Sequence, residues 1–337
     1  MKTLQYISDS LNGAILEEVD VSDNALGSKG VYACKNVLIG KKLERLFVCN
    51  NGLAGETAEL ICQILLEGGA PPLTTLHFFN NMSGDQGAIA VAVIVKACKN
   101  IQDFRFSGTR SQKNGCLHIA ESLATLNTLT RLDLSDNMFK KEAATVLVQG
   151  LALQSGLVHL NLRDGGLGSD GSSQLIDMFK VAPFISKLQL LDLSGNDIDA
   201  DIVSALGALL PQFLSLREFA LDENEIGTEG TMILAKTIDT LQKLESFSLC
   251  TNEVTAAGAY VLTKQLVRIN SLVSIKMDGN MINERGLEEI TSLCMKHHKI
   301  LVEMEDNDEE GDDDIDDVLD QVDDAEDDEL VKGMAAL

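Results

Sequence analysis

The segment Leu43–Leu53, LERLFVCNNGL, contains the pattern that decides the fold of this chain. Its apolar residues are spaced by three, two and five positions, and an asparagine lies two positions before the last; these residues are Leu43, Leu46, Val48, Asn51 and Leu53. One residue separates Leu46 from Val48, so their side chains point to the same face of a short strand, toward a core. The side chains between them are expected to face the opposite way.

The same unit recurs ten times, with spacings between 27 and 31 residues. We call the position of Asn51 the ladder position; its occupants are Asn24, Asn51, Asn81, Thr109, Asn137, Gly165, Asn196, Asn224, Asn252 and Asn280. The pattern L-x-x-L-x-L-x-x-N-x-L is that of a leucine-rich repeat. Repeats of this length accommodate a strand and a full helix. The sequence therefore predicts an α/β leucine-rich repeat horseshoe solenoid of the ribonuclease-inhibitor kind, with parallel strands on the concave face and helices on the convex face.

The repeat domain is predicted to span residues 1–302. Its ladder asparagines have a structural explanation, because an amide can satisfy buried backbone groups of neighbouring repeats. The last helix is expected near residues 283–298. Leu4, Ile7 and Leu11 have helical spacing, so residues 1–12 are predicted to form the helix of an incomplete first repeat, as in a chain that begins within a repeat.

Acidic residues are concentrated near the C-terminus. The chain has a formal net charge of −25, and residues 303–329 contain 18 Asp and Glu with no Lys or Arg. Such a segment repels itself, so residues 303–337 are predicted to form a disordered acidic tail. An amphipathic patch within it is expected to order transiently or on a partner; it consists of Ile315, Val318, Leu319 and Val322. The charge argues against direct binding of nucleic acid and favours a basic protein partner.

The seven cysteines show no CxxC spacing, and no signal peptide is recognisable. These features indicate a reducing compartment, which predicts the cytoplasm, the cytoplasmic face of the nuclear envelope or the nucleus. The longest apolar run, Ala88–Val95, is too short to span a bilayer. We expect a soluble monomer without membrane insertion.

Three short motifs resemble sites of chemistry, and each has a simpler explanation. The glycines of GLGSDG, residues 166–171, match a dinucleotide fingerprint, but two of its positions are regular repeat positions. Residues 306–317 approach the spacing of an EF-hand loop within an acidic run, where such matches arise by chance. His297 and His298 are adjacent on a helix and do not face one another. We predict no metal site and no catalysis by this chain itself.

Polar side chains gather at the edge where each strand enters its loop. The residue directly before the ladder position is polar or glycine in all ten repeats. Folded repeats hold such charges at fixed intervals, which suits docking of a basic protein. We predict partner contacts at Asp133, Asp136, Asp164, Asp192, Asp222, Glu223 and Glu225. A solvated surface without a partner is the alternative interpretation.

Several segments resemble the Ran GTPase-activating protein family, particularly its plant-type members. They are VSDNALGSKG, CNNGLAGETA, FFNNMSGDQGAIAVA, LDLSDNMF and DGNMINERGLEEI. The resemblance covers the chain from Met1 through the acidic tail and includes residues between the repeat leucines. It implies that the repeats bind the GTP-bound form of the small GTPase Ran and stimulate GTP hydrolysis in nucleocytoplasmic transport.

The resemblance also implies a site. A family asparagine in an L-x-L-x-N-x-G segment helps to hold the glutamine of Ran that positions the attacking water. Here the matching segment is Leu46–Gly52 and the matching residue is Asn50, with Asp23 and Asn80 as expected neighbours. GTP and magnesium would belong to the GTPase, so no cofactor is expected in this chain. The family's arginine precedes the segment that resembles VSDNALG, and neither it nor the targeting domain of land-plant members has a match here.

Two other functions stay open at this point. The repeats would serve as an interaction scaffold or inhibitor of a basic protein, without activating a GTPase. Alternatively, the acidic tail would be the functional part, as a histone-binding segment. A change at Asn50 separates these readings, because an activator would lose rate and an inhibitor would show no special sensitivity there.

Overall fold

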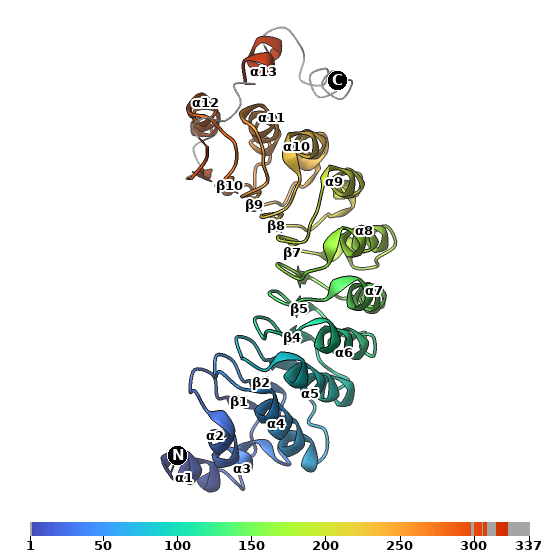
Figure 1. The fold of residues 1–337 in the computed structure, drawn as a ribbon, viewed down its shortest axis with the longest axis vertical. Coiled ribbons are helices and arrows are strands. Elements are labelled where there is room, and N and C mark those ends of the chain that lie inside the picture. The colour runs from blue at the N-terminus through green and yellow to red at the C-terminus, as the bar shows by residue number, and fades with distance from the viewer. Residues whose placement is uncertain (1, 298–299, 305, 309–314, 323–337) are drawn as a thin grey trace. The chain divides into compact units, whose positions relative to one another are not determined.

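The computed structural model describes residues 2–297, 300–304, 306–308 and 315–322. The chain divides into two compact units. The first comprises Met1–Gln174 and Val181–Phe184, and the second comprises Leu175–Lys180 and Ile185–Leu337. Each unit is a series of repeats in which a short strand leads through a loop into a helix (Figure 1).

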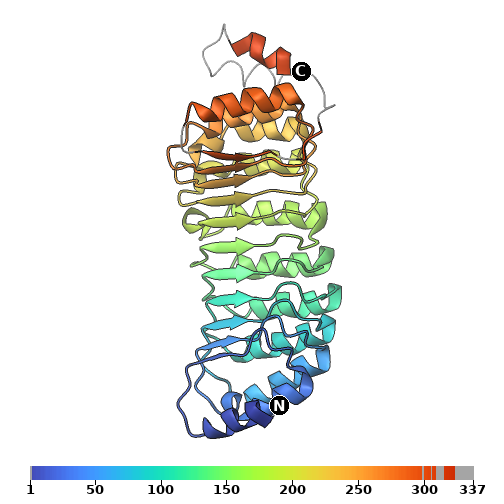
Figure 2. The same ribbon diagram turned by 90° about the vertical axis from the view of Figure 1, so that its left-hand side faces the viewer.

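In the described part of the first unit, six parallel strands follow one another in sequence order (Figure 2). They are β1 (Glu18–Asp20), β2 (Arg45–Phe47), β3 (Thr75–His77), β4 (Asp103–Arg105), β5 (Arg131–Asp133) and β6 (His159–Asn161). The helices are α1 (Lys2–Ser10), α2 (Gly27–Ala33), α3 (Lys35–Leu38), α4 (Gly55–Glu67), α5 (Gly84–Ala97), α6 (Lys113–Leu123), α7 (Lys140–Leu151) and α8 (Gly168–Phe179), the last shared with the second unit.

The described part of the second unit has the same order of elements. Its strands are β7 (Leu190–Asp192), β8 (Glu218–Ala220), β9 (Ser246–Ser248), β10 (Ser274–Lys276) and β11 (Leu301–Glu303). Its α-helices are α9 (Ala200–Gly207), α10 (Gly227–Ala235), α11 (Ala256–Leu266), α12 (Glu284–Met295) and α13 (Ile315–Val322). Short 3₁₀ turns precede three of its strands, at η1 (Ile185–Lys187), η2 (Leu210–Gln212) and η3 (Ile238–Thr240).

Each strand of the first unit buries its central side chain. These residues pair in register from strand to strand and form one buried row: Val19, Leu46, Leu76, Phe104, Leu132 and Leu160. The residues on either side are exposed or half-buried, because alternate side chains of a strand face opposite ways. Burial of each large apolar side chain contributes about 1.5–3 kcal/mol. The row therefore supplies much of the stability of the repeats.

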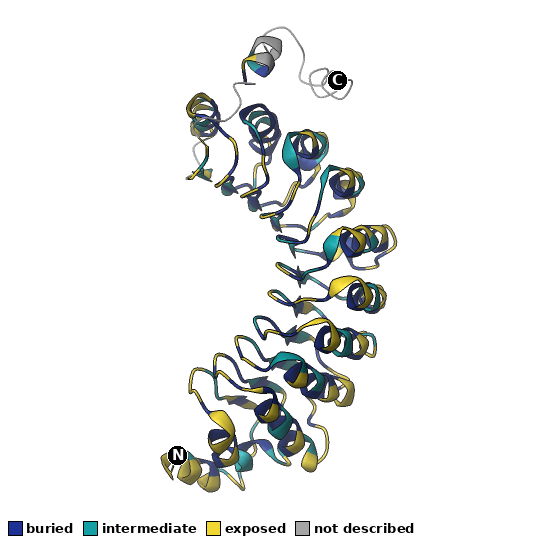
Figure 3. Ribbon diagram, in the orientation of Figure 1, coloured by how far each residue is buried: buried dark blue, intermediate teal, exposed yellow. Residues whose placement is uncertain are grey.

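The helices cover one face of the strands and turn their apolar sides toward them (Figures 1 and 3). In α4, for example, Ala58, Ile61 and Leu65 are buried at helical spacing. Glycine allows the closest approaches between repeats. A Cβ on Gly115 of α6 would lie 2.4 Å from Ser111 Oγ and 2.8 Å from the Cβ of Ala88 in α5.

This architecture confirms the α/β leucine-rich repeat solenoid of the horseshoe class that the sequence predicts. The helix expected near residues 283–298 is α12, which begins at Glu284 and ends at Met295. The helix expected at residues 1–12 is α1.

The ladder asparagines hydrogen-bond successive repeats together, as expected. Asn81 is buried, and its Oδ1 accepts from the backbone N–H of Asn51 at 3.1 Å and of Leu53 at 3.2 Å. Its Nδ2 donates to the carbonyls of Val48 at 2.8 Å and Phe79 at 3.3 Å. In the second unit, Asn224 and Asn280 repeat this arrangement. Asn252 repeats its donating half, to the carbonyls of Leu221 and Cys250. Each of these amides therefore supplies hydrogen bonds to backbone groups of the loops.

The repeats extend further than the ten counted from the sequence. Strand β11 pairs with β10 and crosses the predicted domain boundary at residue 302. Asn307 then continues the ladder, because its Oδ1 accepts from the backbone N–H of Asn280 at 2.8 Å. Helix α13 packs against α11 of the same unit, with Ile315 and Val318 buried, so this patch orders on its own chain. Residues 309–314 and 323–337 of the predicted disordered tail lie outside the described residues.

Within the ranges that the structure describes, no helix is both long and apolar enough to cross a membrane.

Candidate functional site

The residue directly before the ladder position has the same unusual backbone conformation in all ten repeats counted from the sequence. Its φ angle lies between 48° and 66° at Asp23, Asn50, Asn80, Gly108, Asp136, Asp164, Gly195, Glu223, Thr251 and Gly279. Only glycine, and next to it Asn and Asp, adopt this left-handed region readily. The backbone therefore explains part of the Asn, Asp and Gly preference that the sequence analysis read as a docking edge. Glu223 and Thr251 depart from it.

The three predicted N-terminal site residues are brought together by the structure. Asn80 Nδ2 donates to Asn50 Oδ1 at 2.8 Å, and Asn50 Nδ2 donates to Asp23 Oδ1 at 2.5 Å. An ionised carboxylate only accepts hydrogen bonds, so Asp23 fixes which end of the Asn50 amide carries the nitrogen. The three side chains form a one-way chain of hydrogen bonds, from Asn80 through Asn50 to Asp23, across the loops that follow β3, β2 and β1.

A hollow of about 320 Å³ lies beside this chain. It is lined by Asp20, Ser22, Asp23, Phe47, Cys49, Asn50, Phe79 and Asn80. Asn50 is exposed at its rim, whereas Cys49 is buried and its backbone N–H donates to Ser22 Oγ at 3.1 Å. Apolar walls with amide and carboxylate groups at the rim suit an inserted polar side chain of a protein partner.

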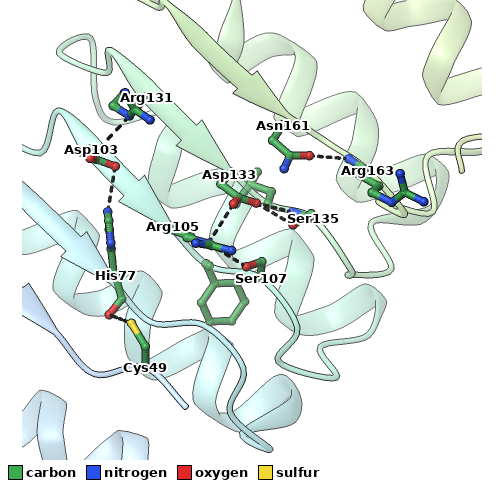
Figure 4. A network of polar contacts seen from close by, with 12 residues as sticks. Cys49, His77, Asp103, Arg105, Ser107, Arg131, Asp133, Ser135, Asn161 and Arg163 are labelled. Carbon is green, nitrogen blue, oxygen red and sulfur yellow. Dashed lines mark hydrogen bonds and ion pairs between the residues drawn. The ribbon is translucent and has the colours of Figure 1, made fainter. Parts of the chain in front are cut away.

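Ion pairs occupy the strand face of the first unit next to this hollow (Figure 4). His77 Nε2 lies 2.9 Å from Asp103 Oδ1, and Arg131 Nε lies 3.8 Å from the other oxygen of the same carboxylate. Arg105 Nε lies 2.9 Å from Asp133 Oδ2, and its guanidinium stacks on Phe79 at 3.9 Å from the ring centroid. The positive and negative side chains of this face therefore neutralise one another to a large extent.

Two of the acidic residues predicted to contact a partner form hydrogen bonds or ion pairs within the chain. Asp133 accepts from Ser135 N at 3.1 Å and Ser135 Oγ at 2.7 Å, besides pairing with Arg105. Asp164 pairs with Arg163 at 3.3 Å. Asp136 is exposed at the edge of the same unit. The partner contacts predicted for these residues stay a prediction. The structure also gives Asp133 and Asp164 contacts within the chain itself.

In the second unit the predicted acidic contacts also divide into two kinds. Asp222 Oδ1 accepts from Cys250 N at 2.9 Å and Ser248 Oγ at 2.5 Å, and Asp192 Oδ1 accepts from Ser194 N at 3.0 Å. These carboxylates tie their strands to the following loops. Glu223 and Glu225 are exposed at the strand–loop edge. We call Glu223 and Glu225 the acidic rim, because these two carboxylates are the most accessible of the predicted contacts in this unit.

Among the described residues, no three His, Cys, Asp or Glu side chains are placed to hold a metal ion. Burial raises the pKa of Cys62, Cys98, Cys116, Cys250 and Cys294 to about 11, which leaves their thiols protonated at neutral pH.

The other motifs have local explanations or fall outside the described part. The glycines of residues 166–171 serve repeat packing: a Cβ on Gly166 would lie 3.2 Å from the Cα of Met138, and one on Gly171 would lie 2.9 Å from the Cβ of Ala144. His298 and residues 309–314, half of the loop resembling an EF-hand, lie outside the described residues.

Two cations at the strand–loop edge were not singled out from the sequence. Arg110 directly follows its ladder residue with φ 58°, and Lys140 stands three positions after its own with φ 55°. The same slot as Lys140 is left-handed in four other repeats, where it is Gly27, Gly84, Gly168 and Gly227. At the Lys140 slot, a basic residue where four repeats have glycine is a signal that comparing the repeats position by position would have found.

Thr251 is expected to destabilise the second unit, because a β-branched residue at φ 53° is sterically strained. We predict that Thr251→Asn raises the free energy of unfolding by about 1 kcal/mol, since Asn tolerates the left-handed region. Urea denaturation followed by circular dichroism checks this. An unchanged or lower midpoint would show that Thr251 is not strained.

Comparisons with known proteins agree with this architecture. A profile of the leucine-rich repeat family matches residues 15–33, 125–148 and 185–207. No curated protein matches the sequence. A chain in the crystal structure of the yeast Rad7 and Elc1 complex is similar, with a TM-score of 0.55 and 15% identity over 80% of this chain and 72% of that one. A Bacteroides fragilis protein covers 80% of this chain and 67% of its own at a TM-score of 0.42 and 13% identity.

The repeat pattern, the parallel strands and the matched segments show that the chain has the leucine-rich repeat fold. Folds of this class present long rows of side chains to other proteins and act as interaction scaffolds. The row that starts at Asp23, Asn50 and Asn80 is the candidate interaction site.

Proposed function

We propose that this leucine-rich repeat protein activates GTP hydrolysis by a Ran-type small GTPase, which docks in its GTP form on the strand–loop edge of the first repeats. The observation that carries the proposal is the hydrogen-bond chain from Asn80 through Asn50 to Asp23, which holds the Asn50 amide in one orientation at the rim of a hollow. The sequence segments that resemble the Ran GTPase-activating proteins supply the partner.

Asn50 keeps the hydrogen-bonding capacity that this role needs. Each amide has two N–H donors and an oxygen with two lone pairs. Asp23 takes one donor and Asn80 takes one lone pair, so one donor and one acceptor stay available. These two groups match the carboxamide of a glutamine in the partner. A glutamine held in this way would position the attacking water, as glutamine does in small GTPases.

The chemistry belongs to the GTPase, which supplies GTP, magnesium and the glutamine. No residue of this chain matches the family arginine, so the proposed acceleration rests on Asn50 and on docking. Arginines supplied in trans to GTPases raise the rate by about 10³- to 10⁵-fold. We expect a smaller stimulation from this chain.

The decisive experiment is single-turnover GTP hydrolysis by Ran with the full chain added. A second reaction contains a version extended by a repeat that bears the family arginine. Stimulation by the chain alone supports the proposal. Stimulation only by the extended version would assign the rate effect to the arginine, and no stimulation by either would reject activation and leave the scaffold function.

The acidic rim of the second unit is proposed to attract a basic surface of the partner. We predict that Glu223→Gln with Glu225→Gln slows association about threefold to tenfold at low salt, with little effect at 0.5 M salt, because such charges act over a Debye length of about 10 Å at 0.1 M salt. Stopped-flow binding measures this. The control, Glu229→Gln with Glu288→Gln, removes the same charge from exposed helix positions, and equal slowing by both variants would reject the rim as a docking surface.

The runner-up function is an interaction scaffold or inhibitor of a basic protein that activates nothing. Two observations favour it. The second unit has exposed carboxylates, and the chain of similar fold in the yeast Rad7 and Elc1 structure belongs to a protein complex. Under this function a change at Asn50 would alter no hydrolysis rate.

A further inference from the structure

We propose that Arg110 and Lys140, together with Met82 and Met138, form a contact surface for a carboxylate with apolar neighbours on a protein partner. We call these four residues the basic edge. The proposed function supplies the identity of the partner, whereas the chemistry of the surface is argued from the residues themselves. The basic edge differs from the acidic rim because its charged side chains are positive.

Both cations occupy backbone slots that strain them. Lys140 stands where four left-handed repeats have glycine, and Arg110 has φ 58° in a slot that is left-handed in five other repeats, at Ala25, Gly52, Gly166, Asp197 and Glu253. A long side chain in the left-handed region costs free energy that glycine avoids. Residues held in such conformations cluster at binding and catalytic sites, where the side chain itself is needed.

Both cations are also available to a partner. Their side chains are exposed, and neither makes a hydrogen bond or an ion pair with the residues that the structure describes. The other cations of the first unit are often paired: Lys96 with Glu121, Lys113 with Glu142, and Lys141 with Asp170. Arg110 and Lys140 therefore have no anion of the described residues to neutralise them, in a chain of net charge −25.

Met82, Arg110 and Met138 lie in three successive loops of the first unit, after β3, β4 and β5, and Lys140 is the first residue of α7. The backbone N–H of Gly84 donates to the Thr109 carbonyl at 2.9 Å, which joins the loop of Met82 to that of Arg110. Thr109 Oγ1 donates to Asn137 Oδ1 at 3.2 Å, which joins the loop of Arg110 to that of Met138. Hydrogen bonds therefore connect the three loops that carry the basic edge, and Asn80 lies in the first of them.

The chemistry of the basic edge selects its ligand. A guanidinium binds a carboxylate through two parallel hydrogen bonds, and a lysine ammonium adds a second positive charge. Met82 is 59% exposed and Met138 is 37% exposed, and such adaptable apolar side chains cover the neighbours of the bound carboxylate. A polyanion such as nucleic acid would be repelled by the rest of the chain. A partner that is basic elsewhere would be oriented by this one reversed contact.

The first test uses the full chain with ¹³C-methyl methionine and two capped peptides, Leu-Glu-Glu-Leu and Leu-Gln-Gln-Leu. The Met82 and Met138 signals are assigned from Met82→Leu and Met138→Leu. We expect saturable shifts of both signals, with the acidic peptide binding at least about fivefold tighter. Arg110→Gln with Lys140→Gln should abolish the difference. The control, Lys236→Gln with Lys243→Gln, removes the same charge from exposed positions of the second unit and should retain it.

Three results would overturn the proposal: no saturable shift, equal binding of the two peptides, or an unchanged preference in the Arg110 and Lys140 variant. The second test titrates GTP-loaded Ran. We expect Arg110→Gln with Lys140→Gln to weaken binding about fivefold to thirtyfold, and to leave the stimulated rate at saturation within about twofold. Peptide binding without Ran binding would reject the proposed function and keep the basic edge. Stimulated hydrolysis, without peptide binding and without weaker Ran binding by the variant, would support the proposed function and reject the basic edge.

Discussion

Replacing Asn50 by glycine is expected to remove most of the stimulation of GTP hydrolysis, because loss of one positioned hydrogen-bonding group lowers the rate of an enzymatic reaction by about 10²- to 10³-fold. Glycine is the informative substitution, because φ is 52° at Asn50 and alanine would add strain. Gly108 already occupies the equivalent position two repeats further on. The loss should appear in the rate at saturation and leave the dissociation constant within about threefold, because the contact forms mainly in the transition state.

Asn80→Gly is the matched control for this result. It removes an amide from the same edge, and the Asn50 carboxamide loses one hydrogen bond and keeps the one to Asp23. We expect a loss of about threefold to tenfold, which corresponds to one neutral hydrogen bond. Equal losses from the two variants would show that Asn50 has no special part, and a change only in binding would favour the scaffold function.

Replacing Asn81 by alanine is expected to give the largest loss of stability, about 3–5 kcal/mol in the free energy of unfolding. Four hydrogen bonds of the buried amide disappear together, two accepted and two donated. The backbone groups of Asn51 and Val48 then stay buried without those partners, which costs more than the bonds themselves contribute. Urea denaturation of the full chain measures the change.

Asn24→Ala tests whether burial is the cause. Asn24 occupies the same ladder position, but its side chain is exposed and donates only to the carbonyls of Val21 and Ser22. Water can replace these bonds, so we expect a loss of about 1 kcal/mol or less. Similar losses at Asn24 and Asn81 would contradict the assignment of the ladder as the main polar support of the repeats.

The sequence by itself determined the repeat, its strands and its ladder. A spacing such as that of Leu43, Leu46 and Val48 is a local signal, because side-chain direction along a strand depends only on position. The ladder amide was predictable for the same reason, since every loop has the same backbone groups to satisfy. Recognition of the segment Leu46–Gly52 also placed Asn50 beside Asp23 and Asn80, which the structure shows in contact.

Only the tertiary structure decided what each edge residue does. The pairing of Asp133 with Arg105 and the packing of α13 on α11 depend on which side chains meet across repeats, and residue spacing does not encode that. The repeat that contains β11 was hidden because Asn307 lies in an acidic run whose composition predicts disorder. The left-handed backbone at Asn50 accompanies a hydrogen bond between loops, in which its N–H donates to the Phe79 carbonyl at 2.9 Å, and residue spacing alone does not encode such a contact between repeats.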